Sequence, residues 1–211
     1  MSRGYLLFAL DNSTVNYSKL THACALSIKI TQPPGFNSVS VVTNNKGYFL
    51  ENKIFDHVIP SGLLSGMDAR AWAYDLSPYD ETVLLDSDMF ILNPINHYWD
   101  IFSRQDLFVT TSPQTYKRKQ FKYGPYRKVF EQYGWPDVYN AYTYFKKSAQ
   151  AEEFFNYVKF ITLHQQEFIN DVLVGSNLTS IPTDEAYALA MVILGLEDSA
   201  TNTSLDFPRI T

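Results

Sequence analysis

Two aspartates separated by one serine, Asp86-Ser87-Asp88, are the residues of this sequence whose types and spacing best suit metal chemistry. They follow an apolar run, Glu81–Leu85, that predicts a buried strand. Residues i and i+2 of an extended backbone point to the same side, so both carboxylates can face one cation. Such hard oxygen ligands suit Mg²⁺ or Mn²⁺, with a diphosphate completing the coordination shell. The bare pattern is also compatible with a polar turn after a strand.

The elements that must position this pair alternate between strands and helices along the chain. Apolar runs predict strands, and apolar residues at helical spacing predict helices. The expected strands cover 5–10, 39–43, 55–60, 81–85, 106–110 and 142–145, and the expected helices 20–28, 66–75, 154–161 and 186–194. This alternation predicts an α/β fold with a mainly parallel sheet flanked by helices.

Polar residues follow three of the predicted strands. They are Leu10-Asp11-Asn12, Thr43-Asn44 and Asp86-Ser87-Asp88. In an open α/β sheet, ligands bind outside the carboxyl ends of the strands. We therefore expect these three segments to border one binding site.

The composition narrows the class of protein. The 211 residues suit one domain, and a net charge of −5 gives no overall attraction to nucleic acid or anionic membranes. A single cysteine, Cys24, excludes an intramolecular disulfide framework and a Cys-based zinc site. Neither a bilayer-spanning run nor a signal peptide is evident, so we expect a cytoplasmic protein.

The segment 76–91, LSPYDETVLLDSDMFI, resembles the metal-binding core of nucleotide-sugar glycosyltransferases with the GT-A fold. Segments 20–30, 41–44, 139–148 and 182–187 are similar to other parts of that group, in particular to glycosyltransferase-like proteins of tailed bacteriophages. The resemblance implies a single GT-A (Rossmann-like) domain over 1–211, with a mixed, mainly parallel sheet. Its donor-binding half would be 1–88, its acceptor-side half 89–195, and 196–211 a truncated terminal segment. In a phage-encoded protein, the cytoplasm would be the host's.

The resemblance also implies a metal-dependent transfer of sugar from a nucleotide-sugar, expected to be a UDP-sugar, to an acceptor. Asp88 would be the main ligand of Mn²⁺ or Mg²⁺, and Asp86 would touch the metal or the donor ribose. The other donor-binding residues would be Leu10, Asp11, Asn12, Thr43, Asn44, Arg70 and Ser87. For Arg70, a solvated charge on a helix is the competing interpretation.

Asp184 and Glu185 are the candidates for a catalytic base, which inverting enzymes need to deprotonate the acceptor hydroxyl. They follow Pro182 at a predicted helix start. Helix capping and compensation of the helix dipole would explain both carboxylates without catalysis. The two interpretations stay open at this point.

A basic, aromatic segment follows the strand after the aspartate pair. Six of the 17 Lys and Arg residues fall within 117–128. The segment suggests a lid over the donor diphosphate, or a platform for a polyanionic acceptor such as modified DNA; a solvated loop is the alternative. The residues concerned are Tyr116, Lys117, Arg118, Lys119, Lys122 and Arg127.

Many GT-A enzymes take a third metal ligand, usually His, from near the carboxyl terminus, and no His of this chain follows residue 164. Either two carboxylates, diphosphate and water hold the metal, or the chain is truncated. A non-catalytic module that binds a nucleotide-sugar or a glycan is the alternative function. A phosphotransferase with an aspartyl-phosphate is disfavoured, because Phe90 stands where that motif needs Thr or Val.

Overall fold

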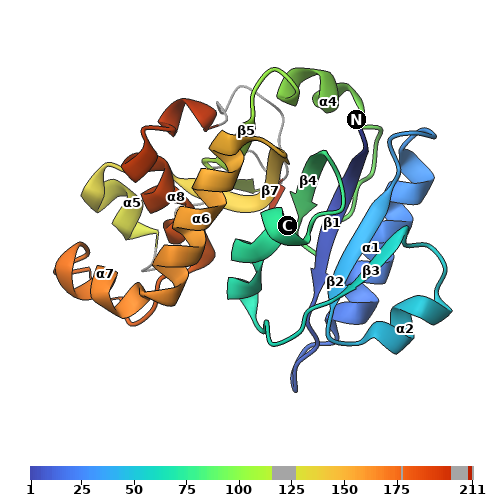
Figure 1. The fold of residues 1–211 in the computed structure, drawn as a ribbon, viewed down its shortest axis with the longest axis horizontal. Coiled ribbons are helices and arrows are strands. Elements are labelled where there is room, and N and C mark those ends of the chain that lie inside the picture. Colours follow the sequence, from blue (N-terminus) through green and yellow to red (C-terminus); the bar gives the residue numbers. More distant parts are fainter. Residues whose placement is uncertain (116–126, 177, 201–208, 211) are drawn as a thin grey trace.

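Six strands form one sheet in the computed structural model, which describes residues 1–115, 127–176, 178–200 and 209–210 (Figure 1). The strand order is β3-β2-β1-β4-β7-β5. The first four in sequence are parallel, and β7 runs antiparallel to both β4 and β5. The strands are β1 (Arg3–Ala9), β2 (Val39–Thr43), β3 (His57–Pro60), β4 (Glu81–Leu85), β5 (Leu107–Thr111) and β7 (Val138–Lys146). The predicted α/β fold with a mixed, mainly parallel sheet is confirmed.

Both faces of the sheet are covered, because its central strand is apolar on both sides. In β1, Leu6 and Phe8 join one hydrophobic cluster with α6 (Ala149–Leu163) and α8 (Thr183–Leu194). Tyr5 and Leu7 join a second cluster with α1 (Tyr17–Thr31) and α4 (His97–Phe102). Figure 1 shows α6 and α8 on the side of the sheet away from α1. The continuous apolar run at 5–10 is the signature of such a doubly covered strand.

Short elements account for most differences from the predicted pattern. The expected helix at 66–75 begins as the 3₁₀ helix η1 (Met67–Trp72) and continues as α3 (Ala73–Leu76). The sequence pattern did not predict the helices α2 (Lys46–Glu51), α4 and α5 (Lys128–Tyr133). Each has six residues, which is less than two helical turns and too short to show a clear periodicity. The remaining elements are α7 (Gln165–Asp171), η2 (Glu197–Ser199) and a parallel pair of β6 (Gln114–Thr115) with β8 (Arg209–Ile210). Among the described residues, no helix has the length and apolarity to cross a membrane.

Gly4 in β1 lies against the ring of Tyr79 and has no room for a side chain. A Cβ atom at this position would lie 2.3 Å from Cζ of Tyr79, whose hydroxyl hydrogen-bonds to Oγ of buried Ser40 at 2.6 Å. We expect Gly4→Ala to lower the free energy of unfolding by about 1–3 kcal/mol, since the ring must move within a packed interior. Urea denaturation measures this change. Gly47→Ala is the matched control, because nothing lies within 4 Å of its added Cβ; equal effects of both variants would contradict the packing explanation.

Candidate functional site

The loop of Asp86, Ser87 and Asp88 leaves the carboxyl end of β4 and is tied to the strands on either side. The backbone N–H of Asp86 donates to the carbonyl of Ala141 at 3.0 Å. The hydroxyl of Ser87, which is buried, donates to the carbonyl of Phe8 in β1. This anchoring leaves Asp86 partly buried and Asp88 exposed. The Ser87 side chain is thus engaged in holding the loop.

Arg70 of η1 is a buried partner of this loop. Its Nη1 pairs with Oδ1 of Asp86, and its Nη2 donates to the carbonyl of Asn140 at 2.5 Å. The Arg70 side chain is only 7% exposed, so the structure rules out the solvated helix charge. Burial raises the pKa of Asp86, and the positive charge of Arg70 opposes that rise.

Asp184 enters the site from the first turn of α8. Its Oδ1 accepts from the backbone N–H of Asn140 at 2.8 Å, and its Oδ2 pairs with Nη1 of Arg127 at 3.1 Å. Both oxygens therefore bond to groups outside α8, and the N-cap residue, Pro182, makes no side-chain cap. Burial raises the pKa of Asp184 to about 6. Asp184 therefore does not cap α8 with its side chain, although it still lies in the first turn of that helix.

Glu185, the neighbour of Asp184, is fully buried. Neither of its carboxyl oxygens has a hydrogen-bond partner among the described residues. Burial raises the pKa of Glu185 to about 8, and the negative charge of Asp184 adds to the rise, while the positive charge of Arg127 opposes it. The neutral acid is thus the favoured form of Glu185 at pH 7.

Residues that the sequence did not single out complete the site. Asn140 links Asp184 to Arg70 through its own backbone N–H and C=O. The phenols of Tyr139 and Tyr187 lie close enough to the site for its charges to act on them: burial chiefly raises the pKa of each, and the charges of Asp86 and Asp184 add to the rise. No spacing signal identifies Asn140, because its contribution is made by the backbone. The only sequence signal at Tyr139 and Asn140 was the similarity of segment 139–148 to an acceptor-side strand.

Several buried polar atoms beside the loop have no hydrogen-bond partner in the described part of the chain. They are Nε of Arg70, Nδ2 of Asn140 and the hydroxyl of Tyr187. Buried polar groups are rarely left unpaired in folded proteins, since each costs about 1–3 kcal/mol. These unpaired polar atoms are enclosed by the protein close to the ion pair of Arg70 with Asp86.

The other predicted strand ends lie together at the same edge of the sheet. Asn44 accepts from the backbone N–H of Asp11 at 3.0 Å and donates to its carbonyl at 2.9 Å. Partial burial raises the pKa of Asp11, but hydrogen bonds from Ser18 and Asn45 outweigh it and lower the pKa. Asn12 holds its own turn, accepting from the N–H groups of Thr14 and Val15.

Leu10 and Thr43, the other two residues predicted at these strand ends, have buried side chains. Leu10 is buried in the cluster of α6 and α8, and the buried Thr43 accepts from the N–H of Asn45 through its hydroxyl. Both side chains are buried at the strand ends, so neither is accessible to a ligand.

A divalent cation at this site would find two carboxylates. Asp88 makes no hydrogen bond or ion pair with the described residues, and the ion pair of Asp86 engages its Oδ1. The described residues contain no group of three or more His, Cys, Asp or Glu that could hold a metal. A cation here would have these two carboxylates at most among the described residues, so a diphosphate and water would have to supply its other ligands.

The basic segment divides between described and undescribed residues. Tyr116, Lys117, Arg118, Lys119 and Lys122 lie outside the described residues. Arg127 is among the described residues. It is not the exposed charge expected of a solvated loop, because its side chain is only 3% exposed and pairs with Asp137 and Asp184. Asp137 and Asp184, which are 10 and 57 residues away in sequence, compensate the charge of Arg127 in the interior.

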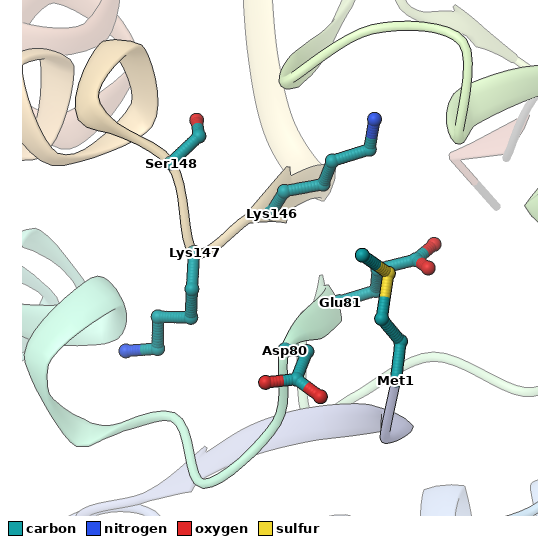
Figure 2. A pocket seen from close by; sticks show the side chains of 6 residues that line it. All are labelled: Met1, Asp80, Glu81, Lys146, Lys147 and Ser148. Atoms are coloured by element: carbon teal, nitrogen blue, oxygen red, sulfur yellow. The ribbon is translucent and has the colours of Figure 1, made fainter.

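A pocket at the opposite end of β4 is a poor candidate for the site (Figure 2). Glu81, its most buried charged residue, pairs with Arg3 at 3.2 Å and accepts from the hydroxyl of Tyr144 at 2.8 Å. Lys147 donates to the carbonyl of Tyr74. Its lining consists of Met1, Asp80, Glu81, Lys146, Lys147 and Ser148. These charges are satisfied within the protein, so the pocket offers a ligand little to bind.

Comparison with solved protein structures supports the α/β fold described above. No family model and no curated protein matches the sequence. Among solved structures, the chain is similar to the glycosyltransferase GlyE of Streptococcus pneumoniae TIGR4, with a TM-score of 0.58 and 12% sequence identity. The match covers 96% of this chain and 45% of GlyE, so the chain spans less than half the length of that protein. The similarity places the sheet and its helices in a glycosyltransferase-like fold.

Proposed function

We propose that this chain is a glycosyltransferase domain that uses a nucleotide-sugar donor, a UDP-sugar in our expectation. The observation that carries the proposal is the position of Asp88, an exposed carboxylate beside Asp86 at the carboxyl end of β4. The similarity of the fold to GlyE, a glycosyltransferase, supports the same function. Ligands of open α/β sheets bind at this edge.

Asp88 and Asp86 would hold Mn²⁺ or Mg²⁺ together with the donor diphosphate. The cation would neutralise the charge that develops on the departing nucleoside diphosphate. Arg70 adds a fixed positive charge next to Asp86. Asp11, Asn12, Thr43 and Asn44 form the neighbouring part of the edge, where the nucleotide would lie.

Asp184 is the residue best placed to act on a hydroxyl group. A carboxyl group with a pKa of about 6 is mostly ionised at pH 7, so it can accept a hydrogen bond or a proton. Glu185 is favoured in its neutral form and is buried behind it, which makes Asp184 the stronger candidate for a base.

The acceptor would approach from the half formed by residues 89–195, with residues 1–88 holding the donor. A glycan or a polyanion such as DNA are the two acceptor classes we propose. The cluster of Lys and Arg within 117–128 supports a polyanion, while the net charge of −5 disfavours it.

Release of UDP from UDP-sugars in the presence of Mn²⁺ tests the proposed function. We expect Asp88→Ala to lower the rate of UDP release at least about tenfold, because the cation loses its most accessible carboxylate. Asp171→Ala, which removes an exposed carboxylate from α7, is the control and should behave as the unchanged protein. Equal rates for both variants would contradict a role of Asp88.

A non-catalytic module that binds a nucleotide-sugar is the second candidate. The observation in its favour is that the described residues supply only two carboxylates for a cation. Binding of UDP-sugar by calorimetry without any release of UDP would support this alternative over the enzyme.

A further inference from the structure

Arg127 is a buried arginine that joins three elements of the fold. It is the N-cap residue of α5, and its Nε and Nη2 lie 3.1 and 2.5 Å from Oδ1 of Asp137, just before β7. Its Nη2 also donates to the carbonyl of Val138 at 2.7 Å, and its Nη1 reaches Asp184 in α8 at 3.1 Å. The guanidinium lies 5.0 Å from the ring centroid of Phe130.

These contacts use the shape of the guanidinium group. Its planar fork donates to two carboxylates and a carbonyl at once, from nitrogens that point in different directions. The single ammonium group of a lysine would have to choose among those acceptors. Asp137 orients the guanidinium group of Arg127, which in turn orients the carboxylate of Asp184.

The carboxylate of Asp184 is consequently held on both oxygens. Arg127 holds Oδ2, and the backbone N–H of Asn140 holds Oδ1 at 2.8 Å. The carbonyl of Asn140 accepts from Arg70, which pairs with Asp86. A series of hydrogen bonds and ion pairs, joined through the backbone of Asn140, therefore runs from Asp137 to Asp86 at the end of β4.

We propose that Arg127 is a positioning residue, which sets the orientation of the Asp184 carboxylate relative to Asp86. The proposal rests on the proposed function for its catalytic consequence, but its structural part stands on the contacts above. A misplacement of a reacting group by about 1 Å can cost about 100-fold in rate. The loss of the fork should therefore affect turnover more than donor binding.

Arg127→Lys keeps the charge but removes the fork, and it tests the catalytic consequence. We expect kcat for UDP release to fall at least about tenfold, while KM for the donor changes less than about threefold. Asp137→Asn loosens the fork without touching Asp184, and we expect a smaller fall in kcat. Arg3→Lys is the control, since Arg3 pairs with Glu81 at the other end of β4. A normal kcat in Arg127→Lys, or a change confined to KM, would overturn the proposal.

The amide of Asn140 gives a measurement that needs no activity. Its N–H donates to Asp184, so ¹H–¹⁵N spectra of Arg127→Lys should show a shifted Asn140 signal with faster hydrogen exchange, and spectra of Arg3→Lys should not. An unchanged Asn140 amide in Arg127→Lys would overturn the proposal. If the unchanged protein releases no UDP, the proposed function fails, and the Asn140 amide still decides whether Arg127 positions Asp184.

Discussion

Replacement of Arg70 by methionine is expected to lower the free energy of unfolding by about 2–4 kcal/mol, because it leaves a buried ion pair with one partner. The arginine side chain is 7% exposed and that of Asp86 29% exposed, so solvent can screen only part of the remaining charge. The carbonyl of Asn140 loses its donor as well. The decrease in the free energy of unfolding should be smaller than for a fully buried ion pair, since the side chain of Asp86 still reaches water.

Urea denaturation at pH 7 measures this effect, and a second substitution identifies its source. The double variant Arg70→Met with Asp86→Asn should recover a large part of the loss, because the unpaired charge is gone. Arg104→Met, at an exposed position, should change the free energy of unfolding by no more than about 0.5 kcal/mol. A double variant no more stable than Arg70→Met would show that the unpaired Asp86 is not the cause.

Glu185→Gln is expected to stabilise the protein increasingly as the pH rises. Burial raises the pKa of Glu185 from 4.5 to about 8, so the folded state holds a proton that the unfolded state releases. The contribution of this bound proton to the free energy of unfolding is fully present below pH 4.5 and is lost as the pH rises to about 8. At about 1.4 kcal/mol per pKa unit, the upper limit of the loss is about 5 kcal/mol, and we expect at least about 2 kcal/mol. Glutamine keeps the shape and never ionises.

Free energies of unfolding between pH 5 and pH 8.5 test this expectation. Relative to the unchanged protein, Glu185→Gln should gain stability progressively from pH 5 to about pH 8, and the two curves should run parallel above that pH. Glu153→Gln, on the exposed side of α6, should parallel the unchanged protein at every pH. Parallel curves for Glu185→Gln over the whole pH range would mean that Glu185 is ionised in the folded state at neutral pH.

The sequence was sufficient to predict the layered fold and the edge where its polar residues gather. Apolar runs identified the central strands, because a strand covered on both faces has little room for polar residues. The ends of β1, β2 and β4 carry the predicted polar segments, and Asp11 and Asn44 are hydrogen-bonded to each other there. The roles of these residues in donor binding stay predictions.

The charge partners inside the site could not be predicted from the sequence. Arg70 pairs with a carboxylate 16 residues away, and Arg127 with carboxylates 10 and 57 residues away. The choice between capping and site roles for Asp184 likewise depends on Asn140, which is 44 residues earlier. Such contacts depend on the tertiary structure, and local patterns carry no signal for them.

The reversed direction of β7 has a consequence for how the site forms during folding. Because β7 is antiparallel to β4, its first residues meet the last residues of β4, with Leu85 opposite Tyr142. Asp86 and Asn140 become neighbours only when β7 has paired with β4, and such a pairing between distant parts of the chain costs loop-closure entropy and slows folding. Residues 1–88 on their own contain the aspartate pair but lack Asn140 and Asp184. Assembly of the site is thus coupled to completion of the whole sheet, and partly folded chains would not present it.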